Sequence, residues 1–214
     1  MSNRLNQLIV SMLACFSALA FCQPVIQATA AILEPQVKRD TGGFKSCGVR
    51  ALVSVVSGKN SDVYDFSIMI DSEFSMASIK AGMVRNTIEA IMNGKGGVVA
   101  IAPAPKNFWF VEEAEGKAIT PIKLFPGDTK GYVLGFTPLD STFRALLEMI
   151  KGTRMQFAAR YEIEPVDRVI TFSASLSNSE FGPMMNCLEK VINRMDAEAK
   201  VKLKSSEKFE GKKQ

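Results

Sequence analysis

The sequence predicts an α+β fold: a single domain with a mainly antiparallel sheet and about three helices, the last of them long and C-terminal. Three observations predict this class. Short runs alternate apolar and polar residues, as strands do when one face is buried. Other runs repeat apolar residues every three or four positions, as amphipathic helices do. The strand-like runs follow one another through short turns, which favours antiparallel pairing with interspersed helices.

The N-terminal residues have the pattern of an export signal. Arg4 supplies a positive charge, residues 8–21 form an uncharged apolar run, and Pro24 precedes small residues. We expect this signal to direct the chain to the periplasm of a Gram-negative envelope, or onward to secretion. Retention as a membrane helix is the alternative, which the short run disfavours because a membrane span needs about 20 apolar residues.

The end of this signal is predicted from small residues at the cleavage point. Ala28-Thr29-Ala30 fits the A-x-A pattern, so we expect residues 1–30 to be a cleaved signal peptide. Cleavage after Ala28 is the close alternative. A lipoprotein attached at Cys22 is disfavoured, because the bulky Phe21 stands where a small residue is normally needed.

Composition divides the remaining chain into three segments. Residues 31–44 have no periodicity and contain Pro35, so we expect a flexible lead-in. Residues 45–199 have the length and patterning of a single α+β domain. Residues 200–214 hold six lysines and two glutamates, and we expect a Lys-rich disordered tail.

The basic charge of the chain is concentrated in this tail, whose net charge of +4 equals that of the whole chain. Contact of the tail with anionic lipid is the minority interpretation of these lysines. Nucleic acid is not an expected partner, because the predicted body offers no basic face.

Apolar spacing predicts the elements of the first half of the domain. Residues 49–55 and 64–70 alternate on either side of a turn and predict a hairpin. Residues 72–93 predict a helix, because one helical face collects Met76, Ile79, Met83, Thr87 and Ile91. Three short strands are expected after it, at residues 98–102, 108–111 and 118–125.

The second half of the domain has the clearest signals. Its expected elements, in order, are a strand at 132–137, a helix at 138–151, strands at 154–161 and 168–176, and a helix from Glu180 onward. Thr137 is the expected N-cap of the first helix, and Gly152 its left-handed stop. Pro183 is tolerated in the last helix because it lies in the first turn.

Removal of the signal peptide would leave only two cysteines, Cys47 and Cys187. Two cysteines in an exported chain are most simply one disulfide. A free catalytic thiol is the alternative, which we discount because the chain contains no histidine to activate it.

The residue inventory argues against an enzyme. Without histidine, a His-based catalytic triad and a His-containing zinc site are excluded. No catalytic residue, metal ligand or cofactor is therefore expected. Carboxylates that could act as an acid–base pair stand at predicted hairpin tips, where charges are normally solvated; they are Glu112, Glu113, Glu115, Glu162 and Glu164.

The only tryptophan lies in a short aromatic run, Phe108-Trp109-Phe110. In a strand, Trp109 faces away from Phe108 and Phe110. Burial on both faces of the strand is the simpler interpretation. The alternative is that this run forms a binding surface, with Trp109 as an anchor for a partner.

Part of the chain resembles a known family. Residues 143–157 read FRALLEMIKGTRMQF, residues 169–177 read VITFSASLS, and residues 43–47 read GFKSC. These segments are similar to the C-terminal region and the early aromatic-x-x-Cys motif of the invasion-associated locus B family. The resemblance implies a non-enzymatic periplasmic or secreted protein connected with host interaction and virulence. Accessory proteins of secretion systems end in a similar strand–helix–Cys pattern.

Together these features predict an exported, non-catalytic envelope protein that binds another envelope protein or a host protein. One alternative is a periplasmic carrier of an apolar small molecule, for which eleven methionines and fourteen phenylalanines could line a pocket. A less favoured alternative is an enzyme that uses carboxylates or a Ser/Lys pair.

Overall fold

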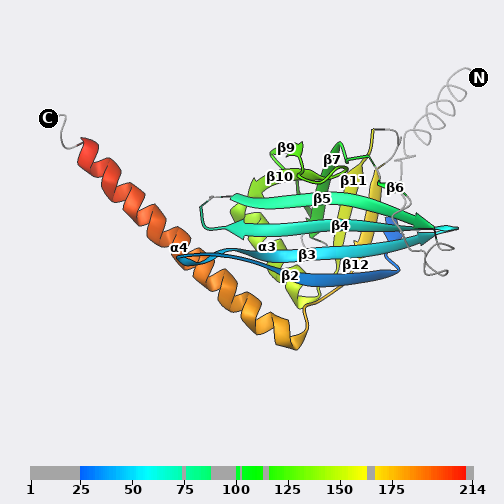
Figure 1. The fold of residues 1–214 in the computed structure, drawn as a ribbon, viewed down its shortest axis with the longest axis horizontal. Coiled ribbons are helices and arrows are strands. Elements are labelled where there is room, and N and C mark those ends of the chain that lie inside the picture. Colours follow the sequence, from blue (N-terminus) through cyan, green and yellow to red (C-terminus); the bar gives the residue numbers. More distant parts are fainter. Residues whose placement is uncertain are drawn as a thin grey trace, which may run out of the picture.

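The computed structural model describes residues 25–73, 76–87, 100–101, 103–112, 116–162 and 167–210. These residues form two β-sheets that face each other, together with two α-helices (Figure 1). The predicted α+β class is therefore confirmed, with two helices rather than about three in the described part of the chain.

The larger sheet has seven strands, and all of its pairings are antiparallel. In spatial order the strands are β2 Ala30–Asp40, β3 Gly43–Ser57, β4 Asn60–Asp71, β5 Met76–Thr87, β10 Val133–Pro138 and β9 Lys123–Pro126, with β6 Ala100–Ile101 paired to β5. The long strands β2 to β5 run side by side in Figure 1. The predicted hairpin corresponds to β3 and β4, which meet at a tight turn with Gly58 at a positive φ of 58°.

The smaller sheet has five strands. In spatial order they are β1 Val25–Gln27, β12 Arg168–Phe172, β11 Met155–Arg160, β7 Asn107–Glu112 and β8 Lys117–Ile119. Every pairing is antiparallel except that between β1 and β12, which is parallel. In Figure 1 the strands β11 and β12 run across the direction of β2 to β5.

The core between the sheets is built around aromatic rings. Phe66 of β4 stacks on Phe157 of β11 with ring centroids 4.9 Å apart. Its ring also lies 4.9 Å from that of Phe110 and 5.4 Å from that of Phe172. Aromatic pairs of this kind contribute about 0.5–1.5 kcal/mol beyond the burial of their area. One residue of the larger sheet thus contacts three strands of the smaller one.

The two helices cover the rest of the inner face of the larger sheet. Helix α3, Leu139–Lys151, contacts β3, β4, β5 and β10, and helix α4, Asn178–Glu210, contacts β2, β3 and β4. The buried apolar positions of α3 are Ala145, Leu146, Met149 and Ile150, and those of α4 include Met184, Leu188 and Val191. Gly152 ends α3 at a positive φ of 87°, as predicted. Beyond its buried segment, α4 extends past the sheets in Figure 1.

The expected disulfide is present. Cys47 of β3 and Cys187 of α4 are bonded with their Cα atoms 6.0 Å apart, and both side chains are fully buried. The bond fixes the buried segment of α4 to the inner face of the larger sheet.

The predicted helix at residues 72–93 is wrong in the described part of the chain, where Met76–Thr87 is strand β5. The buried side chains of β5 lie two positions apart: Ala77, Ile79, Ala81 and Met83. Because Ala77 and Ala81 are small, they do not stand out as core positions in the sequence. The larger apolar side chains, such as Met76, Ile79 and Met83, recur at helical spacing and therefore predicted a helix. Residues 74–75 and 88–93 of that prediction lie outside the described residues.

The lead-in and the tail also differ from expectation. Residues 31–40 are not flexible but belong to β2, which pairs with β3 along its whole length. β2 is an edge strand, and half of the N–H groups of such a strand point away from its neighbour, which is where a proline such as Pro35 is tolerated. Helix α4 continues to Glu210, so the tail is helical up to that residue.

Three further boundaries are corrected. Residues 118–125 form parts of two strands in different sheets, β8 and β9, with Pro121 between them. Strand β12 ends at Phe172. Thr137 lies in β10 and donates its hydroxyl to the Ala77 carbonyl, so it is not the N-cap of α3.

Candidate functional site: a polar groove on the larger sheet

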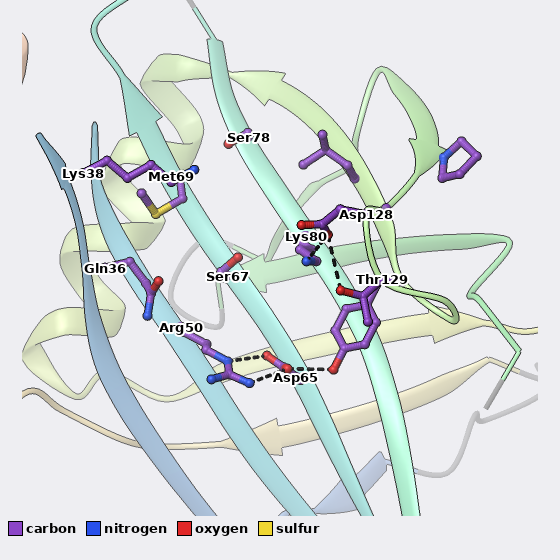
Figure 2. Close-up of a pocket in the computed structure, with 14 residues that line it drawn as sticks. Gln36, Lys38, Arg50, Asp65, Ser67, Met69, Ser78, Lys80, Asp128 and Thr129 are labelled. Carbon is purple, nitrogen blue, oxygen red and sulfur yellow. Dashed lines mark hydrogen bonds and ion pairs between the residues drawn. The ribbon is translucent and has the colours of Figure 1, made fainter. Parts of the chain in front are cut away.

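A groove of about 660 Å³ lies on the outer face of the larger sheet (Figure 2). Its floor consists of outward-facing residues of β3, β4 and β5, because the alternate residues of these strands form the core. Ser67 of β4 is flanked in register by Arg50 of β3 and Lys80 of β5. One wall is formed by β2 and the other by the segment 126–132 between β9 and β10. The polar side chains that line the groove include Gln36, Lys38, Arg50, Asp65, Ser67, Ser78, Lys80, Asp128 and Tyr132.

Two glycines make room for the groove. Gly48 lies in register between Gln36 and Met69 and adds no side chain to the floor. A Cβ atom there would lie 1.8 Å from the Ile68 carbonyl oxygen, so the main chains approach too closely for any other residue. Gly82 has the same role under Tyr132, where a Cβ would lie 2.5 Å from Cδ1 of the ring.

Arg50, Asp65 and Tyr132 form a hydrogen-bonded network at one end of the groove. The Arg50 guanidinium donates to both Asp65 oxygens, from Nε at 2.9 Å and from Nη2 at 2.8 Å. The Tyr132 hydroxyl donates to Asp65 Oδ2 at 2.7 Å. Glu34 of β2 accepts a longer bond, of 3.3 Å, from Arg50 Nη1. The bidentate geometry fixes the orientation of the guanidinium.

The network holds its members in one protonation state around neutral pH. Burial alone would raise the pKa of the Asp65 carboxyl, but the hydrogen bonds from Arg50 and Tyr132 outweigh burial and lower that pKa. Burial raises the pKa of the Tyr132 hydroxyl, and the hydrogen bond to Asp65 raises it further. Asp65 is therefore ionised, and Tyr132 is a hydrogen-bond donor.

Lys80 connects the floor of the groove to its wall. Its ammonium group pairs with Asp128, and it lies 5.1 Å from the centroid of the Tyr132 ring. The hydrogen bond from Lys80 lowers the pKa of the exposed Asp128 carboxyl. Figure 2 shows Lys80 and Asp128 facing each other across this edge of the groove.

A second charged cluster lies on the opposite face of β4, at the margin of the core. Asp62 accepts two hydrogen bonds from Arg85 of β5, of 2.7 and 2.8 Å, and one of 3.0 Å from Arg168 of β12. Arg168 also donates to the Tyr64 hydroxyl at 2.7 Å. Burial opposes ionisation of Asp62, but the two arginines lower its pKa. Because β5 and β12 belong to different sheets, this cluster links the two sheets.

The aromatic run predicted as a binding surface divides between two faces of β7. Phe108 and Phe110 are fully buried in the core and do not contact solvent. Trp109 lies on the opposite face, is partly exposed, and pairs in register with Ala158. Of the three residues, only Trp109 is accessible to a partner.

The candidate carboxylates do not form a described site. Glu162 is exposed at a turn, and the side chains of Glu112, Glu113, Glu115 and Glu164 lie outside the described residues. No group of three or more His, Cys, Asp or Glu side chains among the described residues is arranged to hold a metal ion.

A second, apolar depression of about 460 Å³ lies between α3 and α4. Phe143 of α3 and Met185, Leu188 and Ile192 of α4 line it. It is more open and less polar than the groove on the larger sheet.

The groove was missed by sequence reasoning for a specific reason. Arg50 and Asp65 occupy outward positions of the predicted hairpin, and their pairing could have been found from its register. Lys80 could not, because residues 72–93 were interpreted as a helix. Tyr132 was expected in a strand, with no indication that it folds over Gly82.

Neither helix in the part of the chain that the structure describes combines the length and the apolar character that a membrane span requires. In comparisons with known proteins, no family model, no curated protein and no solved structure matches the chain.

Proposed function

We propose that the chain is an exported, non-catalytic envelope protein that acts by binding another protein, from the envelope or from a host, in the polar groove. The observation that supports this proposal most directly is the groove itself. Its floor presents Arg50, Ser67 and Lys80 on strands that pair on both sides, and strands hold side chains more firmly than loops do.

The groups in the groove are oriented before a ligand arrives. Arg50 is held by Asp65, and Lys80 is held by Asp128. A partner therefore meets fixed donors, and little side-chain entropy is lost on binding. This favours recognition of a polar protein segment.

The charges in the groove favour an acidic partner. Its lining includes three cationic side chains, Lys38, Arg50 and Lys80, and two carboxylates, Asp65 and Asp128. Asp65 and Glu34 already pair with Arg50, and Asp128 pairs with Lys80, whereas Lys38 is exposed on β2. A partner carboxylate placed beside Lys38 would complete the balance of charge.

The protonation states support binding rather than proton transfer. The pKa of Asp65 is lowered and that of Tyr132 is raised, so both move away from neutrality. A general acid or base works best with a pKa near the working pH. These groups are better suited to stay charged or to donate hydrogen bonds.

Site-specific photocrosslinking in the full chain tests the proposal. A photoreactive residue in place of Gln36 would lie in the groove, and one in place of Lys59 would lie in the exposed β3–β4 turn. We expect a covalent adduct with one defined protein from position 36 only. Lys38→Glu should lower its yield about tenfold, which corresponds to roughly 1.4 kcal/mol of binding free energy.

Lys59→Glu is the matched control, because it reverses the same charge outside the groove and should leave the yield unchanged. Equal adducts from positions 36 and 59, or a yield unaffected by Lys38→Glu, would refute binding in the groove.

A carrier of an apolar small molecule is the second candidate. The depression between α3 and α4 favours it, because Phe143, Met185 and Ile192 offer an apolar surface there. The large aromatic side chains do not contribute, since Phe66, Phe110 and Phe157 pack against one another. Native mass spectrometry of protein purified from the periplasm would detect a retained ligand, and a mass equal to that of the bare chain would argue against the carrier.

A further inference from the structure

The segment 25–30 belongs to the folded body, although it lies within the predicted signal peptide. Val25–Gln27 is strand β1, which pairs with β12 in the register Val25↔Val169 to Gln27↔Thr171. β1 therefore covers an edge of the smaller sheet that would otherwise expose unpaired N–H and C=O groups.

The residues after β1 carry the chain from one sheet to the other. The Ala28 N–H donates to the Thr171 carbonyl of β12 at 2.9 Å, and the Thr29 N–H donates to the Ser54 carbonyl of β3 at 2.8 Å. The Thr29 hydroxyl accepts a hydrogen bond of 3.1 Å from the Val56 N–H. Two adjacent residues are thus bonded to different sheets.

The same segment contributes to the core. Ile26, Ala28 and Ala31 are partly buried and pack against it. Cleavage after Ala28 or after Ala30 would remove Ile26 and all of β1. The structure thus provides a physical reason to place the mature N-terminus before Val25.

The sequence contains a second cleavage pattern upstream of this point. Ala18-Leu19-Ala20 fits the A-x-A rule and directly follows the apolar stretch at residues 8–17. A stretch of that length lies within the range of about 7–15 residues typical of the apolar part of a signal peptide. Cleavage there would leave residues 21–24 in front of β1.

We propose that a signal peptidase hydrolyses the peptide bond between Ala20 and Phe21, so that the mature chain begins at Phe21 and retains β1. Water adds across this bond and leaves a carboxylate on Ala20 and an amino group on Phe21. The mature protein then has three cysteines: the Cys47–Cys187 pair and Cys22. This inference rests on the export proposed above and corrects the expected end of the signal.

The test uses the full chain with its own N-terminus and a C-terminal affinity tag, expressed in a Gram-negative host. N-terminal sequencing and intact mass after reduction and alkylation are measured on periplasmic protein. We expect Phe21 as the first residue and three alkylated cysteines. A chain that begins at Ala31 would lack the ten residues from Phe21 to Ala30 and would show two.

Two variants separate the possible sites. Ala20→Leu places a bulky residue at the proposed cleavage point and should leave the leader attached or move the cut. Ala30→Leu is the matched control, since Ala30 is exposed on β2 and the N-terminus should stay at Phe21.

A natural N-terminus at Thr29 or Ala31 would overturn this inference and leave export intact. A leader still attached to the wild-type chain would overturn cleavage altogether, and export by this signal with it.

Discussion

The ring of Tyr132 lies directly against Gly82, which leaves no room for a side chain at that position of β5. The contact places the Tyr132 hydroxyl 2.7 Å from Asp65 Oδ2 and holds the segment between β9 and β10 over the sheet. An aromatic ring that covers a strand glycine in this way compensates for the missing side chain. The pair therefore determines the shape of one end of the groove.

Gly82→Ala should destabilise the protein. The added methyl would lie 2.5 Å from Tyr132 Cδ1, so the ring must move and its hydrogen bond to Asp65 must lengthen. We expect the free energy of unfolding in urea to fall by about 1–3 kcal/mol. Gly182→Ala is the control, because no atom beyond its own helix backbone and chain neighbours lies within 4 Å of the added methyl, and alanine suits a helical position. Gly82→Ala with the stability of the wild type would show that Tyr132 is not packed on the strand.

Asp65 should make stability depend on pH in the acid range. Its pKa is lower in the folded state than in the unfolded chain, where an aspartate titrates near about 3.9. It therefore stabilises the fold above about pH 4, and this contribution is lost as the pH falls through its folded-state pKa. The difference in unfolding free energy between the wild type and Asp65→Asn should be largest near neutral pH and shrink as the pH falls below about 4.

Urea unfolding at a series of pH values measures this difference. Asp196→Asn, an exposed position on α4, is the control and should differ little from the wild type at any pH. A wild-type advantage over Asp65→Asn that stays constant from neutral to acid pH would argue against a charged Asp65 at the centre of the network.

Local sequence patterns were sufficient to predict the elements whose signals are strong. The β3–β4 hairpin alternates clearly, and the end of α3 follows from Gly152, whose left-handed conformation is rare for other residues. The disulfide was predicted by pairing the two cysteines outside the expected signal peptide, although the cleavage inferred above would leave Cys22 in the mature chain as well. In each case the prediction depends on a few neighbouring residues or on a count of cysteines.

Features that depend on distant neighbours were not predictable from those patterns. β5 has alanines at half of its core positions, and their burial becomes evident only from pairing with β4, which places Ala81 beside Phe66 and Ala77 beside Ile70. The groove depends on register, which brings Arg50 and Lys80 to either side of Ser67. β1 owes its structure to pairing with β12, more than 140 residues later in the chain.

The Cys47–Cys187 disulfide should contribute strongly to stability. The two residues are 140 positions apart, so the bond restricts the unfolded chain over most of its length. Cys47→Ala combined with Cys187→Ala should lower the free energy of unfolding by about 2–5 kcal/mol. Urea unfolding followed by circular dichroism measures the loss. A reductant present during unfolding should destabilise the wild type but leave the double variant unchanged. A double variant as stable as the oxidised wild type would contradict this role.

Removal of β1 should cost the fold measurable stability, whichever enzyme trims the natural chain. A chain that begins at Ala31 lacks the hydrogen bonds of Ala28 and Thr29 and the apolar contact of Ile26. A net loss of about 2 kcal/mol is expected from hydrogen bonds of this kind, and in a domain of this size it lowers Tm by roughly 5 °C.

Differential scanning calorimetry of chains beginning at Phe21, Val25 and Ala31, each released from a cleavable leader, measures the effect. The chain from Val25 is the control and should match that from Phe21, because it keeps β1 intact. If the chain from Ala31 melts at the same temperature as the other two, β1 does not stabilise the fold, and the smaller sheet must tolerate β12 as an open edge.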